Sequence, residues 1–183
     1  MNDAYIGKVI NNQNGLNLIM SNETLISIIA SSAVKFTKIC NSLEACRLFI
    51  NSQVARNCIV TNYTVTESIM STSSNMIAAM KESTNYQQYT TTTKNTSTLY
   101  VKLPDTEGAV VFLIDIISPR TQTSPTIYGP LYNQMNVYPS VPTGTVSPVR
   151  IGKFLYKSAK ISIEFGTGVA GRGSDSGATY FIM

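Results

Sequence analysis

Residues 21–80 read SNETLISIIA, SSAVKFTKIC, NSLEACRLFI, NSQVARNCIV, TNYTVTESIM and STSSNMIAAM when they are divided into blocks of ten. Every block opens with two residues drawn from Ser, Thr and Asn, and the first five blocks close on a large apolar residue followed by a second apolar one. A fixed period indicates one small unit copied along an axis, with each copy burying its apolar face on its neighbours. The repeat therefore favours an architectural protein over an enzyme.

The period of ten also limits the helical geometry. Because an α-helix turns about 100° per residue, ten residues fall roughly 80° short of three full turns. One continuous helix would carry the apolar pair around its surface from block to block. One short helix per block avoids this, with the polar pair as N-cap, since a Ser or Asn side-chain oxygen can accept a free backbone N–H. We therefore predict corners at Ser32, Ser42 and Ser52, each followed by a two-turn helix.

One long coiled coil is the competing interpretation of the same segment. Its heptad-like spacings of four and three run through Leu25, Ile29, Ser32, Phe36, Ile39, Leu43, Cys46 and Ile50, then slip and resume at Val54, Cys58 and Val65 as in a stutter. Against it, Ser, Thr and Asn are indifferent helix formers and complementary flanking charges are scarce. We favour the short helices. Both interpretations predict a helical stalk over residues 21–80.

Glycine and proline mark a change of architecture further along the chain. There is no glycine between Gly15 and Gly108, and all seven prolines lie from Pro104 to Pro148. The polar stretch KESTNYQQYTTTTKNTST (residues 81–98) predicts a linker or an extended lead-in strand. We place the domain boundary near residue 97.

The C-terminal residues 99–183 have the pattern of β-strands. We predict strands at 99–103, 109–117, 150–156, 159–165 and 177–183, where β-branched and aromatic residues gather. Short strands joined by Pro- and Gly-rich loops predict an antiparallel β-sandwich or jelly-roll domain. The predicted fold class is therefore α+β, a helical repeat followed by an antiparallel β domain.

The interval 118–149 is predicted to be a long loop, and loops beyond about 15 residues are commonly functional. It carries Tyr128, Tyr132 and Tyr138 among Thr, Ser, Asn and Pro. Exposed tyrosines give contact area at low entropic cost and suit recognition of a glycan or a protein. The alternative is that these rings only hold the loop against the sheet.

A basic cluster spans two of the predicted strands and is relieved only by Glu164. It can meet an anionic surface polymer, or it can simply be a solvated face. Its members are Arg150, Lys153, Lys157 and Lys160.

The composition gives little support for catalysis or for bound groups. The chain has no histidine, and its ten acidic residues are scattered. Asp115, inside an apolar strand, is interpreted as a structural carboxylate with a partner. Cys40, Cys46 and Cys58 fit no zinc spacing. We therefore predict no enzyme, no cofactor and no metal site.

Charge and hydropathy narrow the range of partners. The net charge is +4, but only 13% of the residues are charged, unlike the dense Lys and Arg of nucleic-acid binders. No apolar run approaches the roughly 20 residues that span a membrane, and the first twenty residues lack the pattern of a secretory signal. We expect synthesis in a cytoplasm, without binding to nucleic acid or insertion into a membrane.

The blocks that begin at Ser31, Asn41, Asn51 and Ser71 resemble the decapeptide repeats of bacteriophage tail-fibre and head-fibre structural proteins. The resemblance covers about one third of the chain, and the Ala-Met core of that family is present only around residues 76–80. It implies a virion fibre or appendage, usually homotrimeric, with an N-terminal anchor and a C-terminal β head. Residues 1–20 would be the anchor to a capsid or tail protein of the virion.

The functional hypothesis is thus a phage fibre protein, made in the host cytoplasm and resident in the virion. It would have an anchor (1–20), a stalk (21–80), a linker (81–98) and a β domain (99–183) that is exposed, with a host-surface glycan as a possible ligand. One alternative is a head-decoration or connector subunit with no receptor role. A second, from another class, is a lectin-like protein whose 118–149 loop binds sugar.

Overall fold

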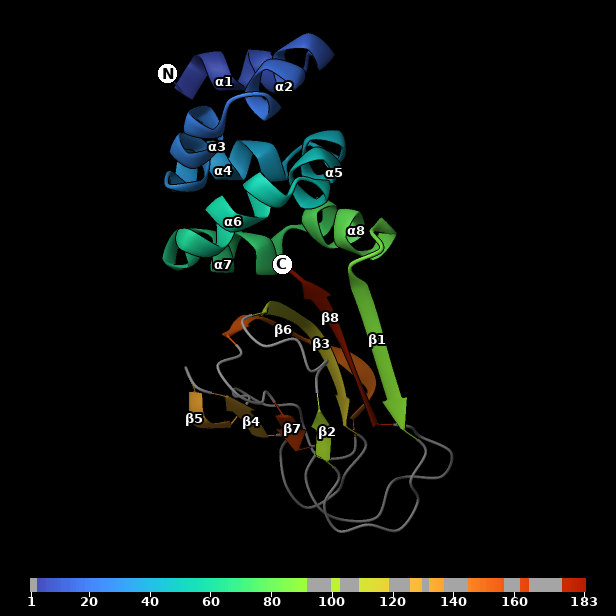
Figure 1. Ribbon diagram of the computed structural model, residues 1–183. Coiled ribbons are helices and arrows are strands. Elements are labelled where there is room, and N and C mark those ends of the chain that lie inside the picture. Colours follow the sequence, from blue (N-terminus) through green and yellow to red (C-terminus); the bar gives the residue numbers. More distant parts are fainter. Residues whose placement is uncertain are drawn as a thin grey trace. The chain divides into compact units, whose positions relative to one another are not determined.

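The computed structural model describes residues 3–91, 100–102, 109–118, 126–129, 132–136, 145–156, 162–164 and 176–183. The chain divides into two compact units, Met1–Tyr86 (with Met183) and Gln87–Ile182. The described part of the first is made of helices and that of the second of β-strands, so the predicted α+β class is confirmed (Figure 1).

The first unit is a run of short helices rather than one continuous helix. In chain order they are α1 (Asp3–Ile10), α2 (Gln13–Met20), α3 (Glu23–Ala30), α4 (Ala33–Cys40), α5 (Leu43–Asn51), α6 (Gln53–Thr61), α7 (Tyr63–Thr72) and α8 (Ser74–Glu82). The continuous coiled coil is therefore not the structure of this segment. The ten-residue spacing also begins before residue 21, because α1 and α2 occupy the stretch that we expected to be a separate anchor.

The corner between α3 and α4 uses both residues of the polar pair. Between α3 and α4, the Ser31 hydroxyl donates to the Ile28 carbonyl at 3.2 Å, while Ser32 Oγ accepts the N–H of Lys35 at 3.4 Å. The first polar residue thus satisfies the end of one helix and the second caps the start of the next. The predicted corners at Ser32, Ser42 and Ser52 are confirmed, and equivalent side-chain caps occur at Asn12, Asn22 and Ser73.

The corner at Asn62 departs from this pattern. Its side chain makes no cap hydrogen bond, and its Nδ2 instead donates back to the Cys58 carbonyl at 2.8 Å. The helix that follows, α7, is ten residues long, and the next cap comes at Ser73 rather than one residue earlier. The period of ten is lost at this point.

The helices are stacked so that each one meets the third helix after it. The stacked pairs are α1 with α4, α2 with α5, α3 with α6, α4 with α7, and α5 with α8, and consecutive helices are also in contact. Three helices therefore make one tier, and we count α1–α3 as the first tier, α4–α6 as the second, and α7 and α8 as the third.

The core of the helical unit follows the same count of ten. When residues are counted from the cap, the fourth position of each helix is buried, at Ile6, Leu16, Ile26, Phe36, Cys46, Arg56 and Thr66. The seventh position adds Ile19, Ile29, Ile39, Phe49 and Ile59. Positions four and seven lie on one face of a helix, so each block turns one apolar stripe toward the same core.

The second unit contains two four-stranded sheets. One has the order β1 (Tyr86–Thr91), β8 (Ser176–Ile182), β3 (Val110–Ser118), β6 (Thr145–Tyr156), and the other β2 (Tyr100–Lys102), β7 (Ser162–Glu164), β4 (Thr126–Gly129), β5 (Tyr132–Asn136). The pairs β2–β7, β3–β6, β3–β8, β4–β5 and β4–β7 are antiparallel.

Both sheets contribute to one hydrophobic cluster. Leu113 of β3 and Tyr180 of β8 come from the first sheet, and Ile127 of β4 and Ile163 of β7 from the second. A shared core is what two packed layers require. The specific sandwich or jelly-roll topology stays a prediction.

Two regions differ from the sequence-based expectation. The interval 118–149 is not one loop, because β4 and β5 pair within it and β6 begins at Thr145. The stretch 81–98 contains the end of α8 and the strand β1. The helical unit therefore ends at Tyr86 rather than near residue 97.

The strand β1 could not be recognised from the sequence, and residues 92–99, which follow it, lie outside the described residues. Polar Thr, Gln and Tyr give little apolar alternation, so pairing of β1 with β8 leaves no clear signal in the sequence.

The cap hydrogen bonds predict a measurable loss of stability. Replacing Ser42 by Ala removes the acceptor for the N–H of Ala45 and should lower the free energy of unfolding by about 1 kcal/mol. Ser27, an exposed residue within α3, is the matched control. Ser27→Ala should change stability by less than about 0.5 kcal/mol in urea unfolding followed by circular dichroism. Equal effects of the two substitutions would contradict the role of the cap.

Candidate functional site

Two of the three tyrosines predicted to contact a ligand, Tyr128 and Tyr132, lie in the hairpin formed by β4 and β5. Tyr128 pairs with Ser162 of β7, and Tyr132 pairs with Gly129 across the hairpin. Tyr138 lies outside the described residues, as do the side chains of Tyr128 and Tyr132. The structure therefore brings the backbones of two of the three tyrosines together at one end of the second sheet.

The basic residues of β6 have different neighbours. Arg150 Nε donates to Asp115 Oδ1 of β3 at 2.6 Å, and the Asp115 side chain is only 12% exposed. Lys153 lies opposite Leu113, a member of the hydrophobic cluster. The predicted partnered carboxylate at Asp115 is confirmed, and Arg150 is its cation.

A bulge separates these two basic residues. The register of β3 and β6 shifts between Leu113 and Asp115, and Gly152 has a φ of 61°, which favours glycine. The bulge explains why Arg150 and Lys153 do not continue one regular row. Lys157 and Lys160, the other two members of the predicted basic cluster, lie outside the described residues.

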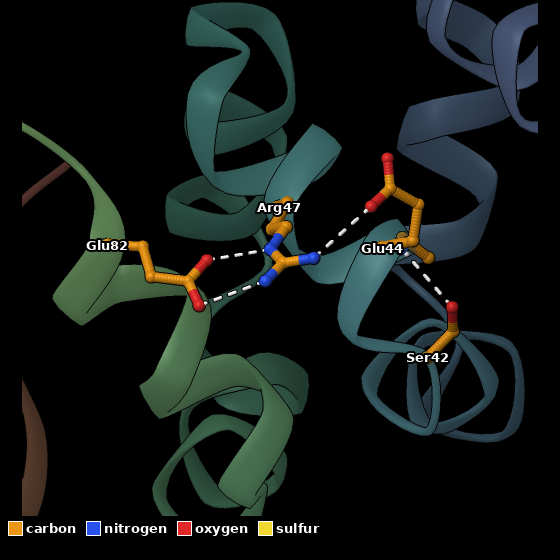
Figure 2. A network of polar contacts seen from close by, with 5 residues as sticks. Ser42, Glu44, Arg47 and Glu82 are labelled. Atoms are coloured by element: carbon orange, nitrogen blue, oxygen red, sulfur yellow. Dashed lines mark hydrogen bonds and ion pairs between the residues drawn. The ribbon is translucent and has the colours of Figure 1, made fainter.

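The helical unit carries its own polar contacts, and the clearest one joins two tiers. Arg47 of α5 donates to both carboxylate oxygens of Glu82 in α8, from Nε at 2.7 Å and from Nη2 at 3.0 Å. Its Nη1 also contacts Glu44 at 3.5 Å, and Figure 2 shows the guanidinium between the two carboxylates. Hydrogen bonding to Arg47 lowers the pKa of Glu82, and the bond to Glu82 raises the pKa of Arg47. This bidentate pair fixes α8 against α5 at the surface.

Polar side chains also occupy the fourth position of three successive helices. Thr66 Oγ1 donates to the Ile59 carbonyl at 2.9 Å, and Arg56 Nη1 donates to the Ile50 carbonyl at 2.6 Å. Cys46 makes the equivalent contact through its thiol at 3.5 Å. Each donor reaches a carbonyl near the end of the preceding helix, and the Ile39 and Ile59 carbonyls also accept the backbone N–H of Ser42 and Asn62. These groups close the corners from inside the core.

The cysteines are free thiols, and two of the three are buried. A hydrogen bond with Cys46, together with burial, raises the pKa of Cys40, and burial raises that of Cys58. Both shifts keep the thiol protonated, which disfavours nucleophilic chemistry. Within the described residues no group of three His, Cys, Asp or Glu side chains could hold a metal ion. In that same part of the chain, no helix has the length and hydropathy that crossing a bilayer requires.

Comparison with known proteins leaves the function to be argued from the structure. No protein-family model matches the chain, and a search of curated proteins gave no significant match. Many polar groups of the helical unit are paired at the corners and in the contacts between tiers, whereas Arg56 Nε is buried without a hydrogen-bond partner.

The buried hydroxyl of Thr66 gives a test of the inner contacts. Thr66→Val keeps the shape of the side chain but removes the hydroxyl that donates to the Ile59 and Asn62 carbonyls, so the free energy of unfolding should fall by about 1 kcal/mol. Thr64→Val in the same helix is the control, since Thr64 is exposed. Its effect in the same urea titration should stay within about 0.5 kcal/mol. A Thr66→Val protein as stable as the control would refute the contact.

The Arg47–Glu82 pair predicts a dependence on pH. Because the pKa of Glu82 is lowered in the folded state from its ordinary 4.5, the pair stabilises the fold above that pH and loses its contribution as pH falls through the lowered value. Glu82→Gln should therefore remove part of the loss of stability seen between pH 6 and pH 3. Urea midpoints at the two pH values measure it. A Glu82→Gln protein with the same acid sensitivity as the wild type would contradict the assignment.

Proposed function

We propose that this chain is a structural component of a bacteriophage virion, a fibre protein in which the helical array is a spacer and the β domain is exposed. The observation that carries the proposal is the ten-residue repeat with its capped corners, whose sequence resembles fibre repeats of phages. A repeat of this kind grows by adding blocks without changing its core.

The chemistry of the helical unit supports a mechanical role. Its buried polar residues donate to backbone carbonyls of the array itself, as Thr66 and Arg56 do. Its surface ion pair, between Arg47 and Glu82, joins one tier to another. These contacts support a structural role for the helical unit, and the proposal assigns recognition to the β domain.

In this proposal the N-terminal helices attach to a capsid or tail protein, and the β domain contacts a host-surface glycan. The hairpin tyrosines Tyr128 and Tyr132 are the first candidates for that contact, since aromatic rings suit sugar faces. Arg150 is paired with Asp115, which reduces the charge that it can offer to an anionic polymer. We also propose that the chain is a homotrimer, as the resemblance of its repeat to those of phage fibre proteins implies.

Immunogold electron microscopy tests the structural role directly. An antibody raised against the purified chain should label intact phage particles from a culture that produces it, at the capsid or the tail. A control antibody against a host cytoplasmic protein should give no label. Label confined to host debris, with bare particles, would overturn the proposal.

Glycan-array binding of the full chain separates adhesion from a purely structural role. The wild type should bind a subset of glycans, and Tyr128→Ala/Tyr132→Ala should lose at least tenfold in affinity (about 1.4 kcal/mol). Tyr63→Ala, an exposed tyrosine of α7, should bind like the wild type. No binding to any glycan would contradict adhesion and favour a head-decoration or connector subunit.

A further inference from the structure

The first turn of α2 contains the only Asn-Gly step in the sequence, Asn14-Gly15. In such a step the backbone nitrogen of the glycine can attack the side-chain amide carbon of the asparagine. Glycine favours the attack because it has no Cβ to hinder its nitrogen and because it adopts the backbone conformations that ring closure needs. The Asn14 side chain is exposed, so water can reach the product of that attack.

The packing of α2 against α1 requires the glycine of this step. A Cβ on Gly15 would lie 2.5 Å from the carbonyl oxygen of Val9 and 2.7 Å from Val9 Cγ1. Both distances are far inside van der Waals contact, so any side chain at residue 15 would push α2 away from the end of α1. The close approach of the two helices therefore keeps the reactive step in the chain.

The side chain that caps α2 also restrains the attacking nitrogen. The N–H of Gly15 belongs to the first turn of the helix, where no helical carbonyl is placed to accept it. It donates to Asn12 Oδ1 at 3.3 Å, and the N–H of Asn14 donates to the same oxygen at 2.9 Å. These two bonds hold residues 14 and 15 in the helix, whereas ring closure needs Asn14 to leave the helical conformation. The Asn12 cap thus opposes the reaction while this corner is closed.

We propose that Asn14 is a site of spontaneous deamidation, and that opening of the corner at Asn12 sets its rate. In the first step the Gly15 nitrogen bonds to Asn14 Cγ, and the side-chain amide group leaves as ammonia with the proton of that nitrogen. The result is a five-membered succinimide ring. Water then adds to either ring carbonyl and breaks its bond to nitrogen. One opening gives aspartate, and the other gives isoaspartate. The reaction consumes one water and needs no oxidant or reductant.

The two products differ in their effect on the fold. Aspartate keeps the backbone of α2 and adds a negative charge to its first turn, where the helix dipole favours one. Isoaspartate routes the main chain through the former side chain and lengthens it by one methylene group. The extra group comes next to Gly15, where the contact with Val9 leaves no room even for a Cβ. We therefore expect isoaspartate to separate α2 from α1 and aspartate to leave the fold intact.

Peptide mapping by mass spectrometry, on the full chain incubated at one mildly alkaline pH, is the test. The folded wild type should convert Asn14 at least about tenfold more slowly than the chain in concentrated urea, because only the open fraction reacts. Asn12→Ala should convert it about fivefold faster than the folded wild type, since loss of a helix cap raises the open fraction by about that factor.

Ser52→Ala is the matched control for the cap. Ser52 Oγ accepts the N–H of Ala55 in α6, also at 3.3 Å, so this variant loses an equivalent bond at another corner. It should leave the rate at Asn14 unchanged. Circular dichroism checks that both variants keep their helix content. An Asn12→Ala protein that converts Asn14 at the wild-type rate would overturn the proposal, and so would equal acceleration by Ser52→Ala.

The wild type and its products complete the test. A folded wild type that shows no conversion at Asn14, over a time in which the urea-unfolded chain converts, would overturn the proposal without any variant. Asn14→Asp reproduces the aspartate product and should have the urea midpoint of the wild type. The isoaspartate form, separated by chromatography, should unfold at a lower urea concentration. Equal midpoints for the two products would contradict the expected separation of α2 from α1.

Discussion

The polar pair at each corner is the interaction on which the rest of the helical unit depends. A helix of two turns leaves most of its terminal N–H and C=O groups without helical partners, and helices this short are not stable by themselves. At the corner after α3, the hydroxyl of Ser31 donates to the Ile28 carbonyl, and the hydroxyl oxygen of Ser32 accepts the backbone N–H of Lys35. With the ends satisfied, the chain can turn after every block. Each short helix then needs only one apolar stripe to be held in place by its neighbours.

Because the chain turns at every corner, the ten-residue repeat folds into stacked tiers of three short helices. Since each helix meets the third helix after it, residues thirty apart in the sequence become neighbours. The fourth position can then hold a polar residue when its donor reaches a carbonyl at the end of the preceding helix, as Thr66 and Arg56 do.

The sequence predicts the helical unit better than the β domain, for physical reasons. Each cap side chain bonds to a backbone N–H only three residues further on, so the positions of Ser32, Ser42 and Ser52 predict their corners from the sequence alone. The polar residues of α2 hide the earlier start of the array, and the Arg47–Glu82 pair depends on tier packing that no local pattern shows. In the β domain, long apolar strands such as β3 are evident, whereas the polar strands β1, β4 and β5 are fixed by their partners in the sheets. The candidate tyrosines could be found from composition, but their placement in a hairpin could not.

The separation of positions thirty residues apart tests the central claim, that the polar pairs divide this segment into short stacked helices. Spin labels are placed at Thr24 of α3 and Val54 of α6, in a protein whose three cysteines, Cys40, Cys46 and Cys58, are replaced by Ala. Pulsed electron–electron double resonance then measures the distance between the two labels. The stacked array predicts a short distance, set by helix axes about 8–10 Å apart and the reach of the two labels. A continuous helix would place the labelled residues about 45 Å apart. A distribution centred near that longer value would contradict the account.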